Sequence, residues 1–327
     1  MEIGSFIELQ IPRGMEYYKG NKWVNMDIVR LNSGRAAIYH AFTATKCKKI
    51  WLPLYQCETV REFLIRKGVA VRYYHIDSSF NPIGLTPSVD DSVLIVNYYG
   101  VMSKDRMRSL VQKYKNVIID NSQAFFAEPI EGCINVYSAR KFIGVPDGAY
   151  AIGENILEGV VNYKQGFSSD TALFLLQRIE YGCEGKSYIS RIENEERIDR
   201  EDCCHMSKLT HYLLDGTDYS KIRDKRRDNF EYACKLFENV NKIYPKLYYD
   251  ETCVPMVYPL LVEDDKLLEK MLSAKHFQGH WWKWVEESEV ANKFEKWVSK
   301  YMIPITIDQR YGVKELDYLK NVVMNDK

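Results

Sequence analysis

Two stretches of the sequence decide the fold: VIIDNSQA at positions 117–124 and CINVYSARKFIG at positions 133–144. An apolar run that ends in a carboxylate, Asp120, is typical of a buried strand with a polar residue at its carboxyl end. The second apolar run ends in a hydroxyl, Ser138, and an amine, Lys141, follows three positions later. The pattern therefore predicts two neighbouring strands whose ends carry Asp120, Ser138 and Lys141.

The first two-thirds of the chain alternates short β-like runs with helix-like runs. We expect strands at 50–53, 69–74, 92–97 and 117–120, and helices at 58–66 and 104–114. This alternation predicts an α/β fold with a mainly parallel sheet and right-handed crossovers. Ligands of such sheets gather at the carboxyl ends of the strands, where Pro53, Asp120 and Ser138 fall.

The remainder of the chain has a different pattern. Residues 154–204 do not continue the alternation, and their charged stretch 191–202 is expected to be a solvated loop or helix face. Helices at 206–214 and 221–240 precede a small α+β unit, with strands at 256–262 and 302–307 and a helix at 266–274. We therefore expect a large α/β domain over residues 1–215 and a small C-terminal α+β domain over residues 216–327.

Composition excludes several classes of protein. The 327 residues contain 45 Lys and Arg against 45 Asp and Glu, so the basic excess of a nucleic-acid binder is absent. The N-terminus lacks the features of a signal peptide, and no apolar run approaches the roughly 20 residues of a membrane helix. The eight cysteines form no CxxC pair. We expect a cytoplasmic protein with reduced thiols and no metal site.

The strand-end residues point to a particular cofactor. A carboxylate and an amine on neighbouring strand ends, with a hydroxyl beside the amine, are what pyridoxal 5'-phosphate (PLP) requires. Lys141 would hold PLP covalently, Asp120 would keep its pyridine nitrogen protonated, and Ser138 would help to bind its phosphate.

A second local signal lies near the N-terminus. Ser33 and Gly34 open an amphipathic helix over residues 36–42, and free amides at a helix N-terminus make a phosphate site. The same residues also fit an ordinary helix cap. The presence of Asp120 and Lys141 downstream makes the phosphate site as well supported as the helix cap, because PLP needs a phosphate site, and both interpretations stay open.

At this point the sequence resembles a known family. Its motifs lie in the order found in the DegT/StrS-type PLP-dependent sugar aminotransferases, from residue 28 or so to the end of the chain. They are SGRAAI at 33–38, LPLY at 52–55, NYYG at 97–100, DNSQA at 120–124 and the Lys141 block. The resemblance to a divergent member of this family implies fold type I, with a mainly parallel sheet of the seven-stranded type.

The resemblance also implies roles for individual residues. Ser33, Gly34 and Arg35 would offer backbone amides to the cofactor phosphate, and Gln123 would approach the ring or its phenolic oxygen. Tyr55, or alternatively Cys57, occupies the segment that stacks on the ring.

The sequence also departs from the family pattern. Cys203 stands where the family presents an asparagine that reaches the partner subunit, and 145–148 (VPDG) replaces a Gly-rich turn. These departures put the sugar-nucleotide substrate in question. They do not affect the residues that are expected to bind PLP.

The activity that the resemblance implies is amino transfer from glutamate or glutamine to a keto-sugar, such as a sugar nucleotide, or to a similar ketone. The enzyme would be a homodimer with its active sites at the interface. Fold does not decide function, and two alternatives stay open. One is a different PLP reaction (elimination, dehydration or decarboxylation), and the other is a non-catalytic PLP-binding regulatory protein.

Overall fold

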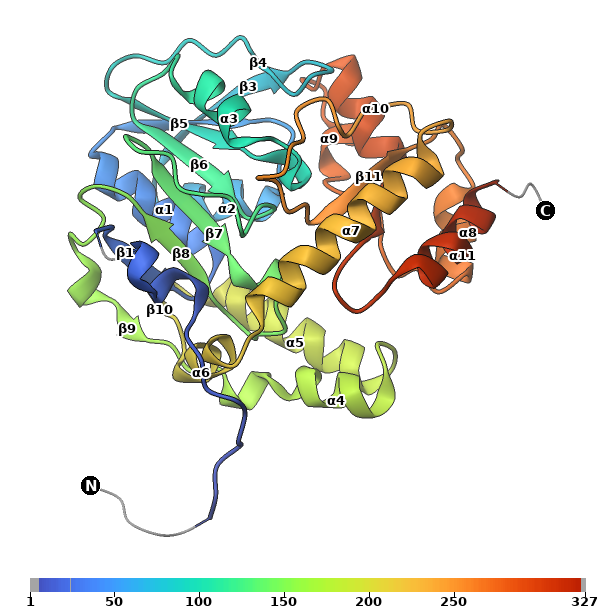
Figure 1. Cartoon of the computed structure of the whole chain (residues 1–327). Helices are drawn as coiled ribbons and strands as arrows, with labels where there is room; N and C mark the ends of the chain where they lie inside the picture. The colour runs from blue at the N-terminus through green and yellow to red at the C-terminus, as the bar shows by residue number, and fades with distance from the viewer. Residues whose placement is uncertain (1–5, 24, 325–327) are drawn as a thin grey trace.

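A ten-stranded sheet forms the centre of the larger part of the molecule (Figure 1). The structure, a computed structural model, describes residues 6–23 and 25–324. The strands follow one another across the sheet in the order β4-β3-β2-β5-β6-β7-β8-β1-β10-β9. Their bounds are β1 Ile28–Leu31, β2 Lys49–Pro53, β3 Ala70–Ile76, β4 Pro82–Ile83, β5 Asp91–Val96, β6 Val117–Asn121, β7 Ile134–Ser138, β8 Ala149–Ile152, β9 Lys164–Gln165 and β10 Cys204–His205.

The sheet is mainly parallel, as the sequence predicts. Strands β3, β2, β5, β6 and β7 are parallel neighbours, whereas β8 runs antiparallel to both β7 and β1. These strands have four to seven residues each, and β4, β9 and β10 add two-residue pairings at the edges. The α/β fold class is confirmed.

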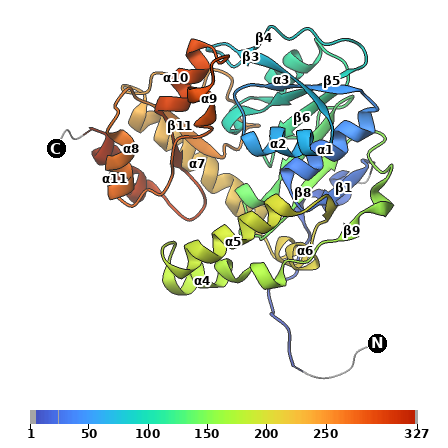
Figure 2. The same ribbon diagram turned by 180° about the vertical axis from the view of Figure 1, so that it is seen from behind.

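Helices cover both faces of the sheet (Figures 1 and 2). Helices α1 (Gly34–Thr45) and α2 (Glu58–Arg66) pack on one face, over a core that includes Ile38, Leu64 and Val136. Helix α3 (Lys104–Val111) packs on the other face. Helix α2 matches the predicted range, and α3 ends three residues earlier than predicted.

The C-terminal part is a small α+β unit. The long helix α7 (Tyr219–Phe237) leads into it, and β11 (Val257–Leu261) pairs antiparallel with β12 (Met302–Thr306). Its other helices are α8 Leu267–Ser273, α9 Trp284–Glu287, α10 Lys293–Tyr301 and α11 Val313–Met324. One apolar core runs from α3 and β5 into this unit. The predicted boundary at 215/216 falls between α6 (Lys208–Asp215) and α7, and it stays a prediction.

Residues 173–200 form a helical hairpin beside the sheet, and the rest of the 154–204 segment includes the edge strand β9. Helices α4 (Leu173–Tyr181) and α5 (Lys186–Arg200) pack against each other and extend from the body in Figures 1 and 2. The charged stretch 191–202 lies largely on α5, so it is a helix face. Short 3-10 helices complete the fold: η1 Tyr17–Lys19, η2 Asn21–Trp23, η3 Tyr98–Gly100, η4 Ala139–Lys141, η5 Val160–Asn162 and η6 Ser169–Thr171. In the described part of the chain, no helix has the length and apolarity to cross a membrane.

Candidate functional site

The carboxyl ends of β6 and β7 place Asp120 and Ser138 on the same face of the sheet. Asp120 is opposite Val136 in the strand pairing, and Val136 lies in the core beneath α1. Because side chains alternate along a strand, Asp120 and Ser138 both face α1. One oxygen of Asp120, Oδ1, accepts a hydrogen bond of 2.8 Å from the backbone N–H of Ser122. The carboxylate is thereby oriented at the edge where ligands of parallel sheets bind.

The start of α1 meets this edge. Ser33 caps the helix, since its Oγ accepts from the N–H of Ala36 at 3.3 Å. A Cβ atom on Gly34 would lie 3.3 Å from Oγ of Ser122 and 3.8 Å from Cβ of Ser138. Three hydroxyl-bearing residues and the free amides of a helix N-terminus therefore surround one small space. Such a space suits a phosphate group.

Lys141 is the last residue of η4, directly after β7. Its side chain is exposed, and it makes no hydrogen bond or ion pair with any residue that the structure describes. The neighbouring Phe142, in contrast, is buried in the core. An amine that has no internal partner is available to a ligand.

Gln123 is buried close to Asp120, but one end of its carboxamide is already engaged. Its Oε1 accepts a 2.7 Å hydrogen bond from the backbone N–H of Tyr99. The backbone also packs closely here, because a Cβ on Gly100 would lie 2.3 Å from the carbonyl oxygen of Gln123. The Nε2 donor of Gln123 has no hydrogen-bond partner among the described residues, so it remains for a ligand.

Tyr55 lies in an aromatic cluster between the two parts of the molecule. Its ring is fully buried and packs edge-on against Trp282 at a centroid distance of 4.5 Å. Its hydroxyl is 2.9 Å from that of Tyr99, and burial raises the pKa of Tyr55 well above its ordinary value. Cys57 is at the N-cap position of α2, with Sγ 3.2 Å from Oγ1 of Thr59. A stacking role for Tyr55 or Cys57 stays a prediction.

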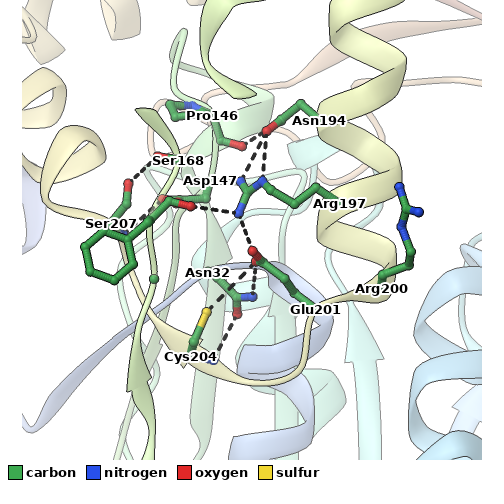
Figure 3. Close-up of polar contacts among 12 residues, drawn as sticks. Asn32, Pro146, Asp147, Ser168, Asn194, Arg197, Arg200, Glu201, Cys204 and Ser207 are labelled. Carbon is green, nitrogen blue, oxygen red and sulfur yellow. Dashed lines mark hydrogen bonds and ion pairs between the residues drawn. The ribbon is translucent and has the colours of Figure 1, made fainter. Parts of the chain in front are cut away.

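A polar network fastens α5 to the same edge of the sheet (Figure 3). Asn194 donates from Nδ2 to the carbonyl of Pro146 at 2.9 Å, and its Oδ1 accepts from Arg197. Arg197 pairs with Glu201 at 2.6 Å, and Glu201 in turn accepts from Nδ2 of Asn32 at 3.2 Å. Asn32 directly precedes the cap of α1. The network therefore ties α5 to the start of α1.

Two further ion pairs join α5 to the candidate site. Arg35, in the first turn of α1, pairs with Asp199, and Arg140, which precedes Lys141, pairs with Glu195. The pKa of Arg140 is lowered, first by burial and in addition by the charge of Arg35, while Glu195 acts in the opposite direction. The two guanidinium groups are thus close enough to influence each other.

The cysteines next to the site are not suited to chemistry. Cys203 is buried with its Sγ 3.8 Å from the carbonyl oxygen of Ala36, in α1. Burial and the charge of Asp202 raise the pKa of the Cys203 thiol to about 12, and burial with the charge of Glu201 does the same for Cys204. Both remain protonated thiols at neutral pH. Among the described residues, no group of three His, Cys, Asp or Glu side chains could hold a metal ion.

The small unit also reaches the site, which the sequence alone did not reveal. Gln309 donates from Nε2 to the carbonyl of Phe142 at 2.9 Å, next to Lys141. Arg226 of α7 lies 4.5 Å above the ring of Phe142, and burial lowers its pKa to about 10. Residues 226 and 309 are far from 142 in sequence, so no local pattern signals these contacts.

Several solved structures share this architecture. The sugar aminotransferase CalS13 from Micromonospora echinospora is 13% identical over 92% of this chain and 87% of its own, with a TM-score of 0.64. The sugar aminotransferase Spr1654 from Streptococcus pneumoniae, in its PLP form, is 13% identical over 90% and 86%, with a TM-score of 0.62. The chain has the fold of the sugar aminotransferases. The fold type I architecture that the sequence predicts is therefore confirmed.

A dehydratase has the same fold. The GDP-4-keto-6-deoxy-D-mannose-3-dehydratase of E. coli, with bound hydrated PLP, is 16% identical over 90% of this chain and 87% of its own, with a TM-score of 0.61. In sequence, the chain matches no protein-family model and no curated protein. The sugar aminotransferase fold is thus recognisable in three dimensions at identities where sequence comparison fails.

Ser122 is a site residue that sequence reasoning did not select. It lies between Asp120 and Gln123, its amide orients the carboxylate, and its hydroxyl faces Gly34. In the sugar aminotransferase fold it stands at the meeting point of β6 and α1. Its position two residues after the strand-end Asp120 was the signal that could have identified it.

Proposed function

We propose that this protein is a PLP-dependent enzyme that modifies a sugar or a similar ketone, and that it transfers an amino group. One observation carries the proposal: the α1 N-terminus, Ser138 and Asp120 converge on one face of the sheet, beside an unpartnered Lys141. The neighbours of known structure that bind PLP support it, because they share the fold over most of the chain.

The residues present fit PLP. The absence of a side chain on Gly34 leaves a space between α1, Ser122 and Ser138 that a Cβ would narrow. In this space the backbone amides of residues 33–35 and the hydroxyl of Ser138 would hold the phosphate. Asp120 would pair with the ring nitrogen, and Lys141 would hold the cofactor covalently. PLP, when bound, supplies an electron sink for the carbon that loses a proton.

The chain's own groups then perform proton transfer. Lys141, freed when the amine substrate takes its place, would accept the proton from the substrate carbon that bears the amino group and would deliver it to the cofactor, as a general base followed by a general acid. Asp120 keeps the ring nitrogen protonated by placing a negative charge beside it. Gln123 can donate only from Nε2, so it would contact an oxygen acceptor such as the phenolic oxygen of the ring.

The substrates that we propose are glutamate or glutamine as donor and a keto-sugar as acceptor. Their support is the family resemblance together with sugar aminotransferases among the structural neighbours. The test is to incubate the purified protein and PLP with an amino donor and nucleotide-linked keto-sugars. Stoichiometric formation of the amino-sugar and of the donor's keto acid is expected, which is 2-oxoglutarate from glutamate and 2-oxoglutaramate from glutamine. A protein that consumes no donor with any keto-sugar or ketone would contradict amino transfer.

Dehydration is the second candidate function. The E. coli dehydratase among the neighbours is a PLP enzyme with the same fold, so the architecture serves this reaction too. A dehydratase would change the keto-sugar by loss of a hydroxyl group. Mass spectrometry of the sugar product separates the two reactions, because only the transferase product gains nitrogen.

We also propose that the enzyme works in the cytoplasm as a homodimer with its active sites near the interface. The support comes from the α4–α5 hairpin, which turns polar residues inward and apolar residues outward. Asn194 of α5 is fully buried, whereas large apolar residues of both helices are exposed. The exposed set is Leu173, Leu176, Ile179, Tyr181, Tyr188, Ile189 and Ile192. Large exposed apolar residues gathered on one helical hairpin support an interface there.

A further inference from the structure

Two arginine side chains come from adjoining segments beside the start of α1. Arg35 lies in the first turn of α1 and Arg140 lies in η4, and the close approach of Gly34 to Ser138 brings these two segments together. Both side chains are largely buried, with exposed fractions of 12% for Arg35 and 18% for Arg140. Two like charges in a partly buried space repel each other unless anionic groups lie between or beside them.

The anionic groups come from α5. Glu195 pairs with Arg140, and Asp199, one turn later on the same helix face, pairs with Arg35. These carboxylates are much more exposed than their partners: the exposed fraction is 36% for Glu195 and 48% for Asp199. The arginine side chains are therefore held in place by burial, whereas the carboxylate side chains can readily turn into solvent and be hydrated.

Geometry and charge together suggest what else this pair could bind. We propose that Arg35 and Arg140 form a phosphoryl-binding pair, and that Glu195 and Asp199 occupy it until a phosphorylated ligand displaces them. Guanidinium groups recognise phosphate through paired N–H donors, and the amides at the start of α1 add donors at the same place. The exchange conserves charge, because two carboxylates leave as one phosphate dianion enters.

A third carboxylate stabilises Arg140 when Glu195 leaves. Asp147 is fully buried and its charge acts on Arg140. Its Oδ1 accepts from the N–H of Ser207 at 3.3 Å, whereas its Oδ2 is buried without a partner among the described residues. An unpaired buried carboxylate oxygen is costly. Asp147 therefore balances the charge of Arg140 from the sheet side while the Glu195 side chain is displaced.

The test compares two sets of carboxylate changes on α5. The full-length protein is titrated calorimetrically with inorganic phosphate, without PLP, as wild type, as the double variant Glu195→Gln/Asp199→Asn and as Glu196→Gln. Glu196 is the matched control, because it pairs with Arg200 on the exposed side of the same helix. The double variant should bind phosphate about 5-fold more tightly or better, and the control should match wild type.

Other outcomes would overturn the inference. If the double variant binds phosphate no more tightly than wild type, the carboxylates do not compete for the arginines. If Glu196→Gln tightens binding as much, the effect is one of net charge alone. Arg140→Gln should weaken phosphate binding by about 10-fold, and Arg140→Lys should recover part of the loss. Equal affinity in wild type and Arg140→Gln would also contradict the proposal.

The source of the phosphoryl group is decided by repeating the titration with three other ligands. If the double variant binds PLP more tightly than wild type does, and binds pyridoxal no more tightly, the arginine pair binds the cofactor phosphate. If the double variant binds uridine diphosphate more tightly than wild type does, and binds PLP no more tightly, the arginine pair binds a nucleotide-linked substrate. The inference rests on the proposed function only for this assignment. Since inorganic phosphate binding does not involve Lys141, its result is independent of whether PLP attaches there.

Discussion

Gly34 and Ser122 approach each other so closely that a Cβ atom on Gly34 would stand 3.3 Å from Oγ of Ser122. The contact joins the first residue of α1 to the turn after β6. It keeps the helix N-terminus directed at the strand end that carries Asp120. Any side chain at position 34 must either move Ser122 or narrow the space that we assign to a phosphate.

Gly34→Ala should therefore lower PLP affinity by about 10-fold and change the free energy of unfolding by about 0.5 kcal/mol or less. The double variant Gly34→Ala/Ser122→Gly should regain much of the affinity, because it removes the hydroxyl that the new methyl group meets. Gly279→Ala is the control, since a Cβ there has no neighbour within 4 Å. The measurement is a PLP titration followed by thermal unfolding. Unchanged affinity in Gly34→Ala would place the phosphate elsewhere.

Asp120→Ala should reduce kcat by about 10²–10³ and affect PLP affinity much less. The carboxylate stabilises charge that develops as the substrate proton leaves, and such contributions appear in kcat. Asp105→Ala is a suitable control, because Asp105 is exposed on α3 and pairs with Arg108 of the same helix. Steady-state kinetics of both variants make the comparison. A near-native kcat in Asp120→Ala would show that Asp120 has a structural role and no role in catalysis.

Lys141 should be the only covalent attachment point. Borohydride reduction of the protein with PLP, followed by peptide mapping, should add the cofactor mass to the peptide that contains Lys141. Lys141→Ala should lose the label and the turnover and keep its thermal stability, because the side chain is exposed and makes no hydrogen bond or ion pair with the described residues. Lys113→Ala, exposed after α3, should be labelled like wild type. Labelling of another lysine would refute the assignment.

Glu16 should make stability depend on pH in the acid range. It is buried, with 2% of its side chain exposed, and burial alone would raise its pKa. Its contacts with His211 and Arg30 outweigh burial, so the pKa is lowered from 4.5. A carboxyl group with a lowered pKa in the folded state contributes stability above its unfolded pKa, and the contribution is lost as pH falls through the folded value.

Glu16→Gln should accordingly cost about 3 kcal/mol at pH 7, because Arg30 loses a buried partner. The difference from wild type should shrink as pH is lowered below 4.5, the ordinary pKa of the group. Denaturant unfolding at a series of pH values measures it. Glu8→Gln serves as the control, since Glu8 and Arg13 form an exposed pair worth about 0–1 kcal/mol. A pH-independent difference would show that Glu16 acts by packing alone.

Ile179→Glu should shift the protein from dimer to monomer. Ile179 lies on α4 with 80% of its surface exposed, and a charge there would be buried in the interface that we propose. Val161→Glu is a control of matched chemistry, since Val161 is 89% exposed in η5, away from the hairpin. Light scattering at micromolar concentration gives the masses. A wild-type monomer, or a dimer unaffected by Ile179→Glu, would exclude this surface as the interface.

The sequence predicted the elements whose apolar residues face the core. Strands β2, β5 and β6 and helix α2 have local patterns of this kind, and they occur where expected. Helix α7 begins earlier than predicted because Asp218 caps it by accepting from the N–H of Lys221. This polar cap lies outside the apolar pattern on which the prediction was based.

Helix α5 could not be predicted with the same reasoning. Its buried residues are Ser187, Asn194 and Ile198, so its inward face is mostly polar and has no helical apolar repeat. Its partners, such as Pro146 and Arg140, are about 50 residues away in the sequence. Asp120, Ser138 and Lys141 could be proposed as site residues from the sequence because strand ends are local features, whereas Arg226 and Gln309 approach the candidate site only through tertiary packing.

The position of β1 has a consequence for biosynthesis. Although β1 is the first strand of the sheet in sequence, it pairs with β8 and β10, at residues 149–152 and 204–205. The start of α1 therefore cannot settle against Ser122 and Ser138 until β8 has left the ribosome. Pairing across such a sequence separation is slow, and β1 is prone to aggregate as long as it has not paired with β8. Nascent chains shorter than about 150 residues should bind chaperones and no PLP. The candidate phosphate site, at the start of α1 beside Ser122 and Ser138, should form in a late step of folding.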